Sequence, residues 1–289
     1  MKVCIGLTDD LNSNIMKNIV FACDGKNFSN GAFAFAKLIN ETEPVLLIGA
    51  FFLSIDYRLL IPSSIYPDPG PLADLVADER VNAIHSVQLF KEECLSNGIE
   101  YRIHEDGKSW DIDELIKESR FSDLVVISEE LFFRNWGNKQ PNHFLREVMH
   151  GCECPVIVIP ENFNSVEKIL IAYDGKPSSV FALKMFSLLF PTYSNLETNI
   201  LYIKDEENEN IPEVKQLQEY ILTHFLNAKI KKLHSDRKSI SNWISNNKNA
   251  LLVTGAFSRS GLSTLLKDSF VAEVIKNHSI PVFIAHNRQ

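Results

Sequence analysis

The stretch EKILIAYDGKPSSVFALKMFSL, at residues 167–188, repeats the pattern of KNIVFACDGKNFSNGAFAFAKL, at residues 17–38. In both stretches a hydrophobic run leads into Ala-x-Asp-Gly-Lys and then into an apolar helical pattern. Asp24 of the first stretch therefore matches Asp174 of the second. A short strand, a tight turn and a helix are the structure that this pattern predicts.

The ends of the two repeats also match. SDLVVIS at residues 122–128 pairs with NALLVTG at residues 249–255, and CPVIVIP at 154–160 pairs with IPVFIAH at 280–286. A repeat of this length predicts two copies of one fold, and 289 residues are enough for about two domains. We therefore predict an appendage at residues 1–15, a first domain at residues 16–162 and a second domain at residues 165–289.

Composition and charge exclude several classes of protein. Hydrophobic residues make up 45% of the chain and charged residues 23%, which is typical of a soluble globular protein. A net charge of -8 argues against a nucleic-acid or membrane surface, because either needs clustered Lys and Arg. The five cysteines are scattered and odd in number, which favours a reducing compartment over a disulfide framework. We expect a cytoplasmic protein, because no signal peptide or apolar run of about 20 residues is present.

Short apolar runs alternate with helical patterns in both repeats. Continuous Val, Ile and Leu runs are typical of strands buried on both faces, and their alternation with helices predicts a parallel, doubly wound sheet. The fold class is therefore α/β, with two tandem, mainly parallel five-stranded sheets and helices on both faces. The predicted strands are at residues 19–22, 45–50, 99–103, 124–127 and 156–159, and at 169–172, 199–203, 229–233, 251–254 and 282–285. The main predicted helices are at residues 72–96, 212–226 and 239–246.

In a doubly wound sheet, ligands bind beyond the carboxyl ends of the strands, where the strand order reverses. This rule selects Asp24, Asp174, Ser128 and Gly255, because each follows or ends a predicted strand. After Gly255 the chain reads GAFSRSGLSTLLKDSFVAEVIKNHSIPVFIA, a small-residue loop followed by a helical pattern. Together with ILIAYDGKPSS, this segment resembles the universal stress protein family, which has an adenine nucleotide alpha-hydrolase-like fold. The resemblance covers about residues 16–287 and corresponds to the tandem two-domain form.

The resemblance implies a phosphate-binding loop with the pattern G-x-x-G-x9-G-S/T. Gly255 matches the first glycine and Ser269 the hydroxyl residue, whereas Ser258 and Asp268 replace the other two glycines. A carboxylate at a helix N-terminus caps the free N–H groups itself and repels a phosphate. We therefore expect the loop to bind ATP weakly or not at all, although Arg259 offsets some of the repulsion.

The resemblance also implies a ribose contact for Asp174 and a base pocket around it. The candidate nucleotide-binding residues of the second domain are Ala172, Tyr173, Asp174, Ile203, Gly255, Ser258, Arg259, Ser269 and Phe270. A second interpretation of Asp174 stays open, because Asp-Gly also favours a simple turn into a helix.

The first repeat lacks the loop. Ser128, Asn142 and His143 stand at the positions that match Gly255, Asp268 and Ser269, with one more residue between the first two. The loop also contains Phe132, Phe133 and Trp136, which are either packing and contact residues or platforms for base stacking. We expect no nucleoside triphosphate in this domain.

No catalytic motif or metal-ligand spacing is present, so we expect binding rather than turnover. The leading hypothesis is a cytoplasmic universal stress-type protein that acts through binding or protein interaction, with weakened or lost ATP binding. The alternative is an ATP-binding, slowly hydrolysing member that uses the second domain, with Mg²⁺. The partners would be other proteins, not nucleic acid or a membrane. The resemblance further implies an internal pseudo-dimer through the strands at 156–159 and 282–285, or a homodimer.

Overall fold

The computed structural model divides the chain into two compact units, residues 1–152 and residues 153–289, and each unit is described by itself. The described residues are 16–25, 27–52, 70–103, 111–128, 147–149, 151–203, 210–233, 242–244, 246–255, 274 and 280–286.

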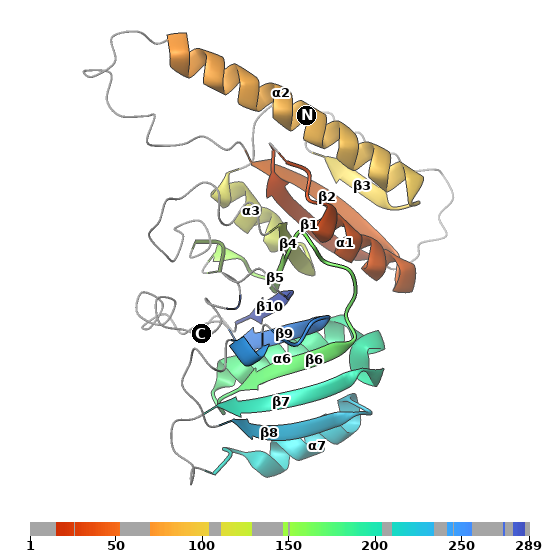
Figure 1. Cartoon of the computed structure of the whole chain (residues 1–289), viewed down its shortest axis with the longest axis vertical. Coiled ribbons are helices and arrows are strands. Elements are labelled where there is room, and N and C mark those ends of the chain that lie inside the picture. The colour runs from red at the N-terminus through yellow and green to blue at the C-terminus, as the bar shows by residue number, and fades with distance from the viewer. Residues whose placement is uncertain are drawn as a thin grey trace, which may run out of the picture. The chain divides into compact units, whose positions relative to one another are not determined.

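The first unit is a parallel sheet with helices between its strands (Figure 1). The strands are β1 (Lys17–Asp24), β2 (Val45–Phe52), β3 (Glu100–Ile103) and β4 (Leu124–Ser128). The helices are α1 (Asn30–Thr42), α2 (Gly70–Ser96) and α3 (Ile112–Ser119). The strand order is β3-β2-β1-β4, so the order reverses between β1 and β4.

Local sequence explains where the helices of the first unit begin. The Ser29 hydroxyl accepts a hydrogen bond from the Ala32 N–H and caps α1, and the Asp111 carboxylate does the same for α3 through the Glu114 N–H. Phe21 on β1 is fully buried and packs against Phe90 of α2, with ring centroids 5.5 Å apart. Aromatic burial therefore fixes the long helix α2 to the sheet.

The second unit is a larger, mainly parallel sheet. Its strands are β5 (Val156–Ile159), β6 (Lys168–Tyr173), β7 (Glu197–Ile203), β8 (Ala228–Leu233), β9 (Ala250–Gly255) and β10 (Val282–Ala285). Its helices are α6 (Pro177–Leu189), the 3-10 helix η2 (Pro191–Asn195) and α7 (Val214–His224). The strand order is β5-β10-β9-β6-β7-β8, and it reverses between β6 and β9. Figure 1 shows β6, β7 and β8 side by side, as their parallel pairing requires.

The last strands of the two repeats pair with each other. Val282 of β10 lies opposite Val158 of β5 in an antiparallel ladder, whereas β10 and β9, β9 and β6, β6 and β7, and β7 and β8 pair in parallel. The expected meeting of residues 156–159 with 282–285 is confirmed. This pairing places β5, which ends the first repeat, in the second compact unit.

The sequence predicted the fold class correctly, because the chain is α/β with a mainly parallel sheet and each repeat contributes five strands. Strands β5 and β10 have the predicted bounds, and the others extend by one or two residues or begin one residue later. Of the helix predicted at 239–246, residues 242–244 are helical. None of the described helices has the length and apolar character that crossing a bilayer requires. The predicted appendage at 1–15 lies outside the described residues.

Two ionisable side chains, the buried Cys94 of the first unit and the half-buried Tyr193 of the second, have raised pKa values. Burial raises the pKa of the Cys94 thiol in α2 from its ordinary 9.0 to about 12, and the nearby Glu93 carboxylate adds to this shift. Burial also raises the pKa of Tyr193 to about 12, where its ring stacks on Phe190. Both groups are therefore neutral at physiological pH.

Candidate functional site

The candidate site of the second unit lies where its strand order reverses. Asp174 directly follows β6 and Gly255 ends β9, and these two strands are parallel neighbours, with Ile171 opposite Val253. The carboxyl ends of parallel neighbours lie at the same edge of the sheet, so Asp174 and Gly255 both lie at that edge. This edge is where doubly wound sheets bind ligands.

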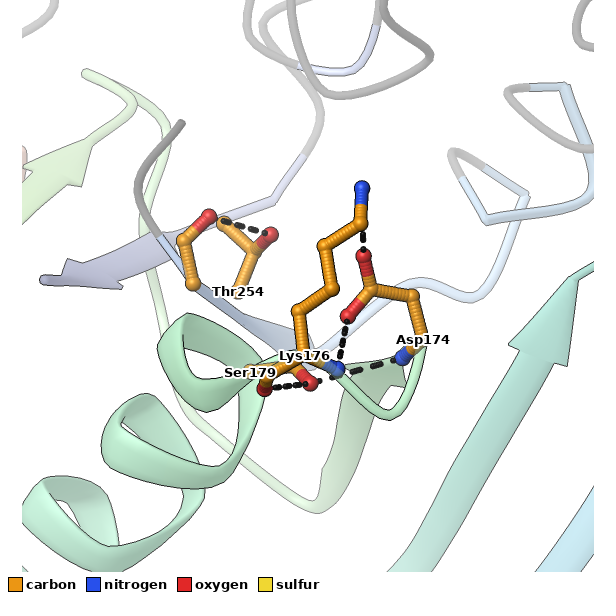
Figure 2. A network of polar contacts seen from close by, with 5 residues as sticks. Asp174, Lys176, Ser179 and Thr254 are labelled. Carbon is orange, nitrogen blue, oxygen red and sulfur yellow. Dashed lines mark hydrogen bonds and ion pairs between the residues drawn. The ribbon is translucent and has the colours of Figure 1, made fainter. Parts of the chain in front are cut away.

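A compact hydrogen-bond network shapes the turn after β6 (Figure 2). The Asp174 Oδ1 accepts from the Lys176 N–H at 3.0 Å, which is an Asx turn. The Ser179 Oγ accepts from the Asp174 N–H at 3.4 Å and donates to the Lys176 carbonyl at 2.9 Å. The turn role of Asp174 is therefore present in the structure, and it directs the chain into α6.

The exposed side chains of Asp174 and Lys176 place one negative and one positive charge at this edge of the sheet. The Asp174 Oδ2 lies 3.4 Å from the Lys176 Nζ, and the two side chains are 44% and 71% exposed. An exposed ion pair of this kind is worth at most about 1 kcal/mol, so either partner can turn to a ligand at little cost. The described residues contain no group of three or more His, Cys, Asp or Glu side chains placed to bind a metal.

Gly255 has a packing reason to be glycine. A Cβ at this position would lie 2.5 Å from the Ser178 carbonyl carbon and 2.7 Å from the Ser179 N. These are backbone atoms at the start of α6, which cannot move aside as a side chain can. Close approach of a helix to a strand end therefore requires glycine here, whether or not a ligand binds.

The predicted pocket walls divide between the two faces of the sheet. Ala172 lies opposite Leu201, so Ala172 and Ile203 are on one face, and alternation places Tyr173 on the other. Ala172 and Ile203 are half-buried, whereas Tyr173 is buried and its hydroxyl donates to the Pro212 carbonyl at 3.0 Å. The structure thus brings Ala172 and Ile203 together with the Asp174 turn, and it gives Tyr173 a different environment.

The predicted phosphate loop lies outside the described residues. This applies to Ser258, Arg259, Asp268, Ser269 and Phe270. In the first repeat, Asn142, His143 and the three aromatic residues of the corresponding loop also lie outside the described residues. Their proposed roles remain predictions from the sequence.

The matching edge of the first unit differs in chemistry. Ser128 ends β4 and is fully buried, and among the described residues its Oγ is a buried oxygen with no hydrogen-bond partner. Asp24 is the last residue of β1 and Gly25 donates its N–H to the Phe52 carbonyl at 2.7 Å. Ser29 matches Ser179 in the repeat, and both serines are buried at the start of their helices. The buried serine at the start of the helix is thus retained in both units, whereas the residue at the neighbouring strand end is not.

Three residues of this region were missed by the sequence reasoning. Lys176 and Ser179 complete the Asp174 turn, and Thr254 is a buried polar residue whose hydroxyl donates to the Gly255 carbonyl at 3.4 Å. The recurrence of Asp-Gly-Lys and of the helix serine in both repeats was the available signal for the first two. Thr254 carried no such signal, because a Thr at the end of an apolar run is ordinary.

Comparison with solved structures identifies the fold. A universal stress protein from Archaeoglobus fulgidus DSM 4304 is similar over 93% of this chain and 98% of its own, with 14% identity and a TM-score of 0.65. A putative universal stress protein from Pseudomonas aeruginosa UCBPP-PA14 has 13% identity and a TM-score of 0.52, with 94% of each chain covered. A functionally unknown protein from P. aeruginosa PAO1 has 14% identity and a TM-score of 0.51, covering 94% of this chain and 93% of its own. At such identities the likeness shows the fold alone. The chain has the universal stress protein fold.

Sequence comparisons add nothing to this result. No protein-family model matches the chain, and no curated protein matches it.

Proposed function

We propose that this chain is a universal stress-type protein of the cytoplasm that acts through binding and protein interaction, not through turnover. The fold supports the protein class, and the exposed Asp174 carboxylate at the reversal of strand order supports a binding site in the second unit. A carboxylate at this position accepts hydrogen bonds from the hydroxyl groups of a ligand. The partners in this proposal are other proteins or a second copy of the chain.

The second part of the proposal is that ATP binding is weakened or lost. Asp268 stands where the resemblance expects a glycine beside the phosphates, and its charge opposes a triphosphate. One oxygen of Asp174 is also engaged by the Lys176 N–H at 3.0 Å, so the turn uses part of the carboxylate's capacity. Charge effects at a helix end are worth about 0.3–2 kcal/mol, which is up to about thirtyfold in affinity.

An alternative function is slow ATP hydrolysis by the second unit with Mg²⁺. The observation that favours it is the Lys176 ammonium, which is 71% exposed and whose ion pair with Asp174 is exposed and therefore weak. A cation at this edge would attract a phosphate chain.

Isothermal titration with ATP, with and without Mg²⁺, separates the two functions. The main proposal expects binding weaker than micromolar for the unmodified chain and a clear gain for Asp268→Gly combined with Ser258→Gly. Lys267→Gly is the matched control, because it removes a charge next to Asp268 but restores no glycine of the pattern. Micromolar binding by the unmodified chain, or no gain in the double variant, would contradict the account of Asp268. Release of ADP in the same samples would support the alternative.

A further inference from the structure

Two tyrosines at the end of the sheet hold one segment of the second unit. Tyr173 of β6 and Tyr202 of β7 lie opposite each other in the ladder, so their side chains are on the same face. They are 3% and 2% exposed. The Tyr173 hydroxyl donates to the Pro212 carbonyl at 3.0 Å, and the Tyr202 hydroxyl donates to the Asn210 carbonyl at 3.3 Å. Two neighbouring strands thus bind two carbonyls of a single stretch, residues 210–213, which leads into α7.

This stretch lies directly against the Asp174 turn. Gly175 has a φ of +78°, and a Cβ placed on it would lie 2.5 Å from the Pro212 Cβ. Gly175 therefore has a left-handed backbone and no side chain at the point where Pro212 packs against the turn. A movement of either segment would open the contact between them.

The backbone after Pro212 is strained, which argues that tertiary contacts hold it. Glu213 has a φ of 49° in the left-handed region, and no described side chain caps the helix that it begins. A left-handed non-glycine residue costs about 1–3 kcal/mol and persists where the surroundings determine it. The two tyrosine hydrogen bonds and the packing of Pro212 against Gly175 are contacts that hold this segment in place.

We infer that Tyr173 and Tyr202 are positioning residues for the Asp174 turn, acting through the segment 210–213. They fix Pro212 against Gly175, and Gly175 in turn fixes Asp174 and Lys176 at the edge of the sheet. Tyr173 thus serves the site from the face opposite Ala172 and Ile203 and does not line the pocket. The inference rests on the proposed function only in taking this turn as the ligand site.

The chemistry of Tyr173 agrees with this role. Burial raises the pKa of its hydroxyl, and the carboxylates of Glu213 and Asp174 add to the shift. The hydroxyl is therefore protonated at physiological pH and remains a donor to the Pro212 carbonyl.

Hydrogen exchange measured by NMR on the full chain without ligand tests the inference. The Lys176 N–H, bonded to Asp174, reports on the turn, and the Leu217 N–H, bonded to the Glu213 carbonyl at 3.0 Å, reports on the start of α7. Tyr173→Phe combined with Tyr202→Phe should accelerate the exchange of both amides about tenfold, because two buried hydrogen bonds are lost. The Leu252 N–H of β9 should keep its protection and so exclude general unfolding.

Two further variants keep the test decisive. Gly175→Ala acts from the side of the turn and should accelerate exchange at Leu217 as well as at Lys176. Tyr101→Phe removes a strand tyrosine hydroxyl of the first unit and should leave both amides unchanged. Fast exchange at Leu217 with an unchanged Lys176, or equal acceleration at Leu252, would overturn the positioning role. This result is independent of ATP affinity, so the failure of either proposal can be recognised without the other.

Discussion

The two units place different residues at the same point of the fold. In the second unit, Gly255 ends β9 and approaches the backbone of Ser178 and Ser179 so closely that a Cβ would lie 2.5 Å from it. In the first unit, Ser128 ends β4 with a side chain that is fully buried. The approach of a helix to the neighbouring strand end therefore decides whether glycine is required. A glycine at this position does not by itself indicate a phosphate loop.

The largest expected effect comes from adding a methyl group at the tight position. Gly255→Ala should lower the free energy of unfolding of the second unit by about 2–3 kcal/mol, because the backbone at the start of α6 must move. Ser128→Gly, at the matching position of the first unit, should change its free energy of unfolding by less than about 1 kcal/mol, because the entropic cost of glycine is offset by removal of the unpaired hydroxyl. Urea unfolding followed by hydrogen-exchange mass spectrometry reports the two units separately. An equal, small effect in both units would show that the close approach at Gly255 is not a constraint.

A pair of glycines, Gly98 and Gly175, separates the cost of a left-handed backbone from the cost of crowding. Gly98 and Gly175 have φ values of 62° and 78°, but an added Cβ meets nothing within 4 Å at Gly98 and lies 2.5 Å from Pro212 at Gly175. Gly98→Ala should therefore cost about 1 kcal/mol, from the left-handed backbone alone, and Gly175→Ala about 2–3 kcal/mol. The same unfolding measurement checks this, and equal losses would contradict the contact between Pro212 and the turn.

Alkaline pH should destabilise the first unit before the second. The folded pKa of Cys94 is raised from 9.0 to about 12, so its contribution to stability is complete below pH 9 and is lost as the pH rises towards 12. The loss at pH 10 is about 1 kcal/mol, because the unfolded thiol ionises and the buried one does not. The pKa of Tyr193 in the second unit is also raised in the folded state, so this unit also loses stability at alkaline pH. This loss begins only near the ordinary pKa of tyrosine, 10.0. Urea midpoints measured as a function of pH should fall first for the first unit, and Cys94→Ala should remove this early fall.

The smallest effect is expected at Ser128. Its hydroxyl is buried without a partner among the described residues, and an unsatisfied buried polar group is unfavourable. Ser128→Ala should raise the free energy of unfolding of the first unit by up to about 1 kcal/mol. A loss of stability would indicate that this hydroxyl has a partner, such as a buried water.

Strand positions were predictable because both faces of these strands are buried. The runs at β5 and β10 are four apolar residues each, and all four residues of each strand are buried. A proline stands directly before each strand, Pro155 before β5 and Pro281 before β10. The pairing of these two strands followed from the resemblance and could not come from hydrophobicity. The site was only partly predictable. The sequence identified Asp174 and Gly255, but the packing of α6 on Gly255 and the tyrosine bonds to residues 210–213 depend on contacts between distant segments.

The face of the sheet on which Tyr173 lies shows a second limit of prediction from the sequence. Alternation along β6 already implied that Ala172 and Tyr173 face opposite sides. The sequence did not say on which face residues 210–213 would pack, because the answer depends on how the chain continues after β7. The hydrogen bond of Tyr173 to Pro212, 39 residues away in the chain, shows that this segment packs on the Tyr173 face.

The stoichiometry of ATP binding tests the central claim, that only the second unit keeps a ligand site, most directly. In the chain with Asp268→Gly and Ser258→Gly, isothermal titration should give one ATP per chain. Adding Asp174→Ala should weaken binding about tenfold, since a hydrogen bond to a charged group is lost, and adding the matched Asp24→Ala should change nothing. Two ATP molecules per chain, or an equal loss from Asp24→Ala, would contradict the account.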